Sequence, residues 1–422
     1  MSKYQSTREY ANHCDEQDSL KNYRNHFHLP QHEGKPLIYL CGNSLGLQPK
    51  GAAKIISEEL EVWSDLAVEG HFKGKRPWME YHKNFTEGLK RIVGAKSNEV
   101  VAMNSVTANL HLMMVSFYRP TEKRYKILCE AGAFPSDQYA LESQARFHGF
   151  DPDDAIVEMK PGDGAHTIND KDIISKIHEL GDSLAMVMFG GVQYYTGQFF
   201  DLPTITSEAH KVGAIAGFDL AHAVGNIPLS VHDWGVDFAV WCSYKYLNSG
   251  PGAVGGTFVH ENNLEKDLPQ FAGWWGHKEE ERFFMRKGFI PMNDAGRWQL
   301  SNAPVLNMAS HLASLEIFQQ AGMDNLRKKS LELTGFLEFL LNRESSLFDI
   351  ITPEDPSQRG CQLSIEIKGG GKPTFDRLTQ RGVIADWREP NVIRVAPVPL
   401  YNTFTEVFDF VDILREELTQ LR

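Results

Sequence analysis

The chain has no apolar run near the roughly 20 residues that span a membrane, and no basic excess. Its 43 lysines and arginines are outnumbered by 55 aspartates and glutamates, for a formal net charge of −12, which argues against nucleic-acid or anionic-membrane partners. The N-terminus, MSKYQSTREYANHCDEQD, is too polar for a signal peptide. The five scattered cysteines include no CxxC pair, so we expect reduced thiols in a cytoplasmic protein, without a disulfide framework or a metal site.

Length and composition are those of an ordinary globular protein with more than one domain. The chain has 422 residues, which is long for a single hydrophobic core. From about residue 72 to 305, apolar segments alternate with helical periodicity, which predicts an α/β fold with a mostly parallel sheet. The last hundred residues have a mixed pattern. We therefore expect an N-terminal arm with helices (1–71) that packs with the small domain, a large domain (72–305) and a small α+β domain (306–422).

Individual elements follow from the spacing of apolar residues. Helical periodicity is clear in residues 51–71 and 307–320. The last hundred residues read as helix, strand, helix, strand, helix. The expected strands cover residues 124–130, 183–191, 213–218, 237–242 and 255–260 in the large domain, and 361–368 and 391–397 in the small domain.

Lys245 is the most informative residue. It follows an apolar strand and precedes a glycine-rich loop, so its amine is poorly placed for solvent. Burial disfavours the ammonium and favours a nucleophilic amine that can form a Schiff base. Asp219 ends a second apolar strand, close before His222. Pyridoxal phosphate requires such a pair, a lysine for its aldehyde and a carboxylate for its ring nitrogen. A solvated lysine and a helix-capping aspartate are the ordinary alternatives.

The glycine-rich loop matches a dinucleotide-binding pattern in its amino-acid sequence but not in the secondary structure expected after it. Residues 250–255 read GPGAVG, but a dinucleotide loop must open a helix. The following residues, 256–259, read GTFV and predict a strand. We therefore reject a nicotinamide dinucleotide and assign these glycines to the turn that leads away from Lys245.

Three further segments suit the same cofactor. The helix start at residues 104–107 offers free N–H groups and the Thr107 hydroxyl to a phosphate. The segment AFPSD offers Phe134 for stacking on a pyridine ring and Asp137 to support that ring. Tyr244 can donate to a phosphate or to a reacting oxygen. Taken singly, each segment also has a structural explanation, as a helix cap, a turn or a core tyrosine.

Arg394 lies inside the apolar segment NVIRVAP of the small domain. An arginine is uncommon in such a strand unless its charge is paired. A substrate carboxylate that accepts two hydrogen bonds would pair it, and so would an internal aspartate or glutamate. The sequence leaves both explanations open.

Together these segments resemble fold-type I pyridoxal-phosphate enzymes, and in detail the kynureninase family. The resemblance extends from residue 41 to about 402, and its most specific run is HDWGVDFAVWCSYKYLNSGPG, around Lys245. It implies a large domain with a mostly parallel seven-stranded sheet and a smaller α+β C-terminal domain. The other matching runs are CGNSLGLQPK, GHFKGKRPW, MNSVTANLHL, FPSDQYA, GVQYYTGQ, GFDLAHAVGN, GWWGH, LSNAPV and RVAPVPLYNT.

The resemblance implies a role for each site residue. Lys245 is the Schiff-base lysine, and Asp219 is the partner of the pyridinium nitrogen, with His222 beside it. Tyr244 belongs to the phosphate site and is the candidate for proton transfer at the substrate carbonyl, and Arg394 takes the α-carboxylate. The other cofactor contacts are Val106, Thr107, Phe134, Pro135, Ser136, Asp137, Trp274 and Asn302. The other substrate contacts are Ser44, His71, Ser301 and Asn302.

The implied reaction is hydrolytic cleavage of the Cβ–Cγ bond of L-kynurenine or 3-hydroxy-L-kynurenine. It gives L-alanine and an anthranilate, within tryptophan degradation that feeds NAD biosynthesis. We expect a homodimer with shared sites, in which Trp274 and Asn302 come from the partner subunit. Because His71, Ser301 and Asn302 can all hydrogen-bond, we expect the 3-hydroxy substrate to be preferred.

Two alternatives stay open. The first is another enzyme of this fold, such as a cysteine desulfurase or a class V aminotransferase. A desulfurase needs a cysteine on a mobile loop, but the late cysteine, Cys361, opens an expected strand. The second is a non-enzymatic protein that has kept the fold, against which the intact Lys245 argues. One departure from the family pattern is Gly190, where some relatives carry serine, so we assign its side chain no cofactor contact.

Overall fold

Apolar runs without polar interruption form the main sheet of the computed structural model, which describes residues 3–344, 346–369 and 371–419. The strand order is β4-β10-β9-β8-β7-β5-β6. Strand β10 is antiparallel to both neighbours, and the other pairs are parallel, so the mostly parallel seven-stranded sheet is confirmed. The strands are β4 (Val100–Ala102), β5 (Lys126–Glu130), β6 (Ile156–Met159), β7 (Leu184–Gly190), β8 (Ile215–Asp219), β9 (Phe238–Trp241) and β10 (Gly256–Val259).

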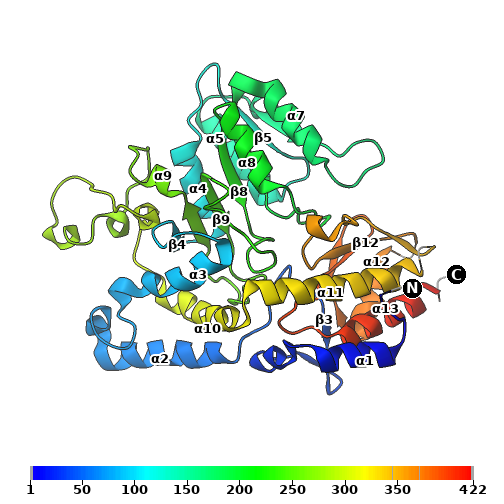
Figure 1. Ribbon diagram of the computed structural model, residues 1–422. Coiled ribbons are helices and arrows are strands. Elements are labelled where there is room, and N and C mark those ends of the chain that lie inside the picture. Colours follow the sequence, from blue (N-terminus) through cyan, green and yellow to red (C-terminus); the bar gives the residue numbers. More distant parts are fainter. Residues whose placement is uncertain (1–2, 345, 370, 420–422) are drawn as a thin grey trace.

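Helices cover both faces of this sheet (Figure 1). Because side chains alternate along a strand, Ile127 of β5 packs with the helices α4 and α5, while Leu128 belongs to the core on the other face, with α7 and α8. Both faces are therefore apolar, as parallel sheets require. The helices of this domain are α3 (Thr86–Val93), α4 (Val106–Phe117), α5 (Pro135–Phe147), α6 (Pro152–Ala155), α7 (Asp170–Leu180), α8 (Leu202–Lys211) and α9 (Glu261–Leu264).

The last hundred residues form an antiparallel sheet of order β11-β12-β15-β14 with helices. The two expected strands are present as β12 and β15, but the two outer strands were not expected. Their three-residue length and charged residues, such as Asp386 and Arg388 in β14, hide the alternation that marks a strand. The elements are β11 (Phe348–Ile350), β12 (Leu363–Ile367), β14 (Asp386–Arg388), β15 (Val392–Val395), α11 (Met323–Asn342), α12 (Gly371–Gln380) and α13 (Phe404–Thr419).

The N-terminal segment runs beside the C-terminal one. Helix α1 (Arg8–Gln17) packs against α13, and Figure 1 shows both ends of the chain on that side. Strand β3 (Ile38–Tyr39) pairs in parallel with β13 (Val383–Ile384). The remaining N-terminal strands are β1 (Gln31–His32) and β2 (Lys35–Pro36).

Helix α2 (Gly51–Leu66) packs on α10 (Val305–Ala321). The helix expected over 51–71 is shorter, because Ala67 has a positive φ of 45° and a 3₁₀ turn, Ala67–His71, follows it. In the described part of the chain, we find no helix with the length and apolar character of a membrane span. Other 3₁₀ turns are Lys21–His26, Trp78–Phe85, Gly181–Ser183, Trp274–Gly276, Arg282–Phe284, Ala295–Trp298 and Pro356–Gln358.

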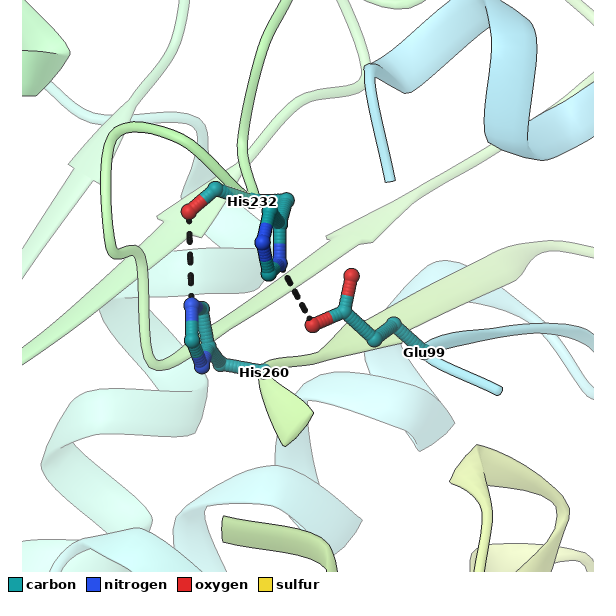
Figure 2. Close-up of side chains that lie close together, drawn as sticks. All are labelled: Glu99, His232 and His260. Carbon is teal, nitrogen blue, oxygen red and sulfur yellow. Dashed lines mark hydrogen bonds and ion pairs between the residues drawn. The ribbon is translucent and has the colours of Figure 1, made fainter. Parts of the chain in front are cut away.

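Glu99, His232 and His260 meet at the edge of the sheet opposite Lys245 (Figure 2). They flank β4, β9 and β10 at the same edge, because β10 runs against the other two. Glu99 is fully buried; it accepts hydrogen bonds from His232 Nδ1 (2.8 Å) and from the backbone N–H groups of Lys96 and Glu261 (2.8 Å each). The imidazole rings stack at 4.9 Å and 7°, so their in-plane lone pairs do not converge on one point. This arrangement is a hydrogen-bonded clamp that joins three distant segments.

Candidate active site

A cavity at the carboxyl ends of the parallel strands collects most of the expected cofactor residues. Ligands of open α/β sheets bind at this edge, and strands β5, β7, β8 and β9 all end there. The loop after Lys245 leads directly into strand β10 and not into a helix, as expected for a loop that binds no dinucleotide. The cavity is lined by Val106, Thr107, Glu130, Phe134, Ser136, Asp137, Gly190, Val192, Tyr194, Asp219, Ala221, His222, Tyr244 and Lys245.

Lys245 is half-buried, and its amine faces this cavity rather than the apolar strand before it. Its Nζ lies 3.0 Å from His222 Nε2 and 5.7 Å from the centre of the Phe134 ring. Burial, with the nearby charge of Lys245, holds the pKa of His222 well below its usual range. The imidazole is therefore neutral, and its Nε2 can accept a hydrogen bond from the Lys245 amine. His222 Nδ1 is buried and has no partner among the described residues.

Two carboxyl groups, Asp219 and Asp137, lie together in the same cavity. Asp219 ends β8, where its Oδ1 accepts a hydrogen bond from the backbone N–H of Ala221 (2.7 Å). Burial raises the pKa of both acids, and the neighbouring negative charges raise that of Asp137 further. Two negative charges in this cavity are therefore costly. A cation placed against Asp219 would relieve this repulsion.

Glu130 is a third acid in the cavity, and the sequence analysis missed it. It ends β5 and is 3% exposed; both carboxylate oxygens accept from the backbone N–H of Gly190 (3.0 and 3.2 Å). Burial raises its pKa to about 7. A Cβ on Gly190 would lie 2.9 Å from Glu130 Oε1, so glycine leaves room for this acid. The signal that identified Asp219, an acid closing an apolar strand, would have found Glu130 too.

The first turn of α4 lies at the cavity, where the sequence predicts an anion site. The helix begins at Val106, and the Ser105 side chain makes no capping hydrogen bond. Val106 and Thr107 line the cavity, and unsatisfied N–H groups at a helix start favour a phosphate. Burial raises the pKa of Tyr244, which keeps its phenol protonated and able to donate.

Arg394 lies just behind the cavity wall. The guanidinium is 1% exposed; it pairs with Asp386 (Nη2 to Oδ2, 2.7 Å) and donates from Nη1 to the Tyr194 carbonyl (2.5 Å). The Tyr194 ring lines the cavity, and the guanidinium lies 5.7 Å from the ring centre. Arg394 therefore forms the internal ion pair, and Tyr194 separates its guanidinium from the cavity.

Ser44 does not line the cavity but lies in a segment fixed to the Lys245 loop. Three residues earlier, Cys41 bridges to Ala396, next to β15. The Gly46 N–H donates to the Tyr244 carbonyl (2.8 Å), and a Cβ on Gly46 would collide with the Lys245 carbonyl. Glycine is therefore required for this close approach.

Besides Ser44 and Arg394, five expected contacts do not line the Lys245 cavity within one chain. Pro135 is exposed at the start of α5. His71 and Asn302 line a second cavity, and Ser301, beside Asn302, is exposed. Trp274 is 45% exposed, and its indole N–H donates to the Arg282 carbonyl (3.1 Å).

The residues that do line the cavity fit pyridoxal phosphate. The orphaned Nδ1 of His222 offers a hydrogen-bond donor, and Asp219 offers a carboxylate whose burial calls for a cation. The start of α4 offers N–H groups to a phosphate, and Lys245 offers an amine. Lys245, Asp219, His222, Thr107 and Tyr244 would hold the cofactor.

Known proteins resemble the chain along almost its whole length. A kynureninase from Flavobacterium psychrophilum is 54% identical over 99% of both chains, and one from Myxococcus xanthus is 55% identical over 97% of both. Residues 326–414 match the family model "Kynureninase C-terminal domain".

Solved structures share the fold at low sequence identity. The cysteine desulfurase CsdA from Escherichia coli has a TM-score of 0.76 at 16% identity, over 94% of this chain and 98% of that one. A cysteine desulfurase from Thermococcus onnurineus NA1 has a TM-score of 0.74 at 16% identity, over 91% and 95%. With these structures giving the fold and the relatives above giving the family, the chain belongs to the kynureninases, which are pyridoxal-phosphate enzymes.

Proposed function

We propose that the protein hydrolyses the Cβ–Cγ bond of L-kynurenine, of 3-hydroxy-L-kynurenine or of both, giving L-alanine and an anthranilate. The observation that carries this proposal is the meeting of Lys245, His222 and Asp219 in one cavity, in a chain 54–55% identical to kynureninases. The place of the reaction would be tryptophan degradation toward NAD biosynthesis. A cytoplasmic location is supported by five free cysteines, four of them buried.

Each residue then has a task that its surroundings support. Pyridoxal phosphate, when bound, supplies an electron sink for charge developing next to the substrate amine. Asp219 keeps the ring nitrogen protonated. Lys245 exchanges a proton at its amine, and neutral His222, 3.0 Å away, accepts a hydrogen bond from it. Tyr244 holds a phenolic proton for the substrate carbonyl, and Arg394 balances the α-carboxylate.

The direct test is incubation of the purified holoenzyme with each substrate. We expect a fluorescent anthranilate and L-alanine in equal amounts. Absence of both products from a preparation with full cofactor content would refute the proposal. Cysteine is the control substrate, because burial raises the pKa of the Cys361 thiol to about 12, which makes it a poor sulfur acceptor. Release of sulfide would instead support a desulfurase.

We also propose a homodimer with shared sites. Trp63, on α2, and Asn302 line one cavity, and Phe72 and Arg282 line the next. These neighbouring cavities join the end of α2 to residues 279–307 in a surface rich in exposed apolar side chains, which is typical of subunit contacts. The exposed apolar residues in these segments and just before residue 279 are Leu60, Trp63, Val68, Phe72, Phe271, Trp274, Phe283, Phe284, Met285, Ile290 and Leu306.

Mixing two inactive variants tests the shared site. Lys245→Ala and Trp274→Ala should each be inactive alone, because one lacks the amine and the other the partner's contact. After subunit exchange, each hybrid dimer has one intact site, so we expect recovery of about a quarter of wild-type activity. Exchange is verified with differently tagged subunits. Proven hybrids without activity would show that Trp274 acts within its own chain.

The preference between the two substrates is proposed from His71, Ser301 and Asn302. His71 and Asn302 line one cavity, and the described residues that line it all differ from those that line the Lys245 cavity. The two residues would therefore contact the ring of a substrate bound in the partner subunit. A pocket built to bond a hydroxyl leaves polar groups unpaired when the hydroxyl is missing, at a cost of about 1–3 kcal/mol each. His71 Nδ1 already contacts the Val68 carbonyl at 3.0 Å, which leaves its Nε2 for a ligand.

We therefore expect 3-hydroxy-L-kynurenine to be the better substrate, by about tenfold in kcat/KM. Replacing His71 and Asn302 together, by phenylalanine and threonine, should reduce this ratio toward one. Arg415→Ala, which removes an exposed ion pair with Asp412 on α13, is the control. A wild type that prefers kynurenine, or a ratio unchanged in the double variant, would contradict this assignment.

A further inference from the structure

Two arginines of the small domain share one aspartate behind the cavity wall. Asp386 of β14 lies directly opposite Arg394 of β15, and Arg388 is two residues along β14, on the same face. Arg394 Nη2 lies 2.7 Å from Asp386 Oδ2, and Arg388 Nε lies 2.9 Å from Asp386 Oδ1. The side chains are 1%, 35% and 10% exposed for Arg394, Arg388 and Asp386. The strand register alone therefore brings the three charges together.

The trio has one positive charge too many. Two guanidiniums carry two charges, because arginine stays protonated in proteins, and Asp386 carries one opposite charge. The titratable groups next to the trio do not compensate. Burial raises the pKa of the Cys41 thiol to about 12, and His222 is held neutral by burial and by the nearby cations, both arginines included. Arg394 is buried and Arg388 is 35% exposed, so water solvates the surplus charge only in part. Such a charge is costly, and the site favours an anion.

The surplus charge lies behind Tyr194, a residue that lines the active-site cavity. Both guanidiniums lie 5.7 Å from the centre of the Tyr194 ring, which lines the cavity beside Lys245. Arg394 also donates to the Tyr194 carbonyl, and its Nε has no hydrogen-bond partner among the described residues. Arg388 is the more exposed of the two cations. A donor is thus still free at the inner arginine, and a second cation stands further out.

We propose that Arg388 and Asp386 complete the carboxylate site of the substrate. Asp386 is a positioning residue that holds both guanidiniums against Tyr194, and Arg388 is the second cation of the site. The inference rests on the proposed function insofar as that function supplies an α-amino acid as the ligand. On this proposal, the combined positive charge of Arg394, Arg388 and Asp386 selects a substrate with a free carboxylate, rather than Arg394 alone.

A purely structural role for the trio makes a different prediction. If Asp386 only tied β14 to β15, its loss would weaken all ligands equally and lower the stability of the small domain. If the trio recognises the negative charge of the ligand, substitutions at Arg388 weaken the binding of a ligand with a carboxylate. They leave the binding of the same ligand without a carboxylate unchanged. L-Alanine and L-alaninamide differ in that single group.

The experiment titrates the holoenzyme with L-alanine and with L-alaninamide and follows the absorbance of the bound cofactor. The wild type should bind L-alanine more tightly. Arg388→Gln should weaken the binding of L-alanine by about tenfold, because one charged hydrogen bond is lost. The binding of L-alaninamide should not change. Arg388→Lys should restore part of the difference. Arg381→Gln, in an exposed ion pair with Glu416 of the same domain, is the matched control.

Asp386→Asn separates positioning from binding. With the kynurenine substrate we expect a KM raised about tenfold and a kcat within about twofold of wild type. Equal weakening of both ligands in Arg388→Gln overturns the proposal, as does a wild type that does not distinguish them. Because the titration needs no carbon–carbon cleavage, an enzyme that discriminates the two ligands but does not cleave kynurenine would refute the proposed function and leave this inference standing.

Discussion

Replacing Lys245 with alanine should abolish turnover, with a loss of at least about 10⁴-fold. The variant has no amine to bind the cofactor covalently and no base next to His222 in the cavity. Wild-type protein should be yellow, and borohydride should fix the cofactor to the peptide that carries Lys245. The colour is measured by absorbance, and the labelled peptide is identified by its mass.

The control is Lys211→Ala, which removes an exposed lysine in an ion pair with Glu208 on α8. It should keep its colour, its labelled peptide and its activity. Exogenous methylamine should recover part of the Lys245→Ala activity, because a small amine can take the place of the lost one. A Lys245→Ala protein that still reacts with borohydride at the cofactor and turns over normally would show that another residue carries the chemistry.

Replacing His232 with alanine should lower the free energy of unfolding by about 3 kcal/mol. Glu99, fully buried, would lose its only side-chain partner among the described residues and keep two backbone N–H groups. Urea unfolding of the holoenzyme measures the change. Because the clamp lies at the edge of the sheet opposite Lys245, kcat per folded molecule should stay the same.

Two comparisons make this stability prediction specific. His178→Ala removes a histidine–glutamate pair in which the histidine is exposed (49%) and Glu208 (16% exposed) keeps Lys211 as a second partner, so it should cost less than about 1 kcal/mol. The double variant Glu99→Gln/His232→Ala should recover part of the loss, because an amide is cheaper to bury than a carboxylate. A loss below about 1 kcal/mol in His232→Ala, or a lower kcat, would contradict the assignment of a structural clamp.

The fold and the centre of the site could be predicted because they depend on local patterns. Strands such as β8 and β9 are apolar throughout, and the residues that follow them must meet at one edge of a parallel sheet. Lys245 and Asp219 were therefore expected in one place, and the structure brings them together with His222.

The remaining features depend on contacts between distant segments, which no spacing reveals. Arg394 was recognised as unusual, but its pairing with Asp386 requires the register of β14 on β15, and β14 was too short and too charged to be expected. Glu130 was missed although its pattern was the same as that of Asp219. The roles of His71, Ser301, Asn302 and Trp274 stay predictions, because within one chain these residues lie away from the Lys245 cavity.

The parallel pairing of β3 with β13 has a consequence for how the protein is made. Residues 38–39 leave the ribosome well before their partners, residues 383–384. The same holds for Asp18, whose buried carboxylate pairs with Lys329 at 2.7 Å. Residues 18, 38 and 39 must therefore wait, without these partners, through the translation of more than three hundred others. A nascent chain arrested before residue 383 should expose this segment to proteases and chaperones, while the main sheet is already complete.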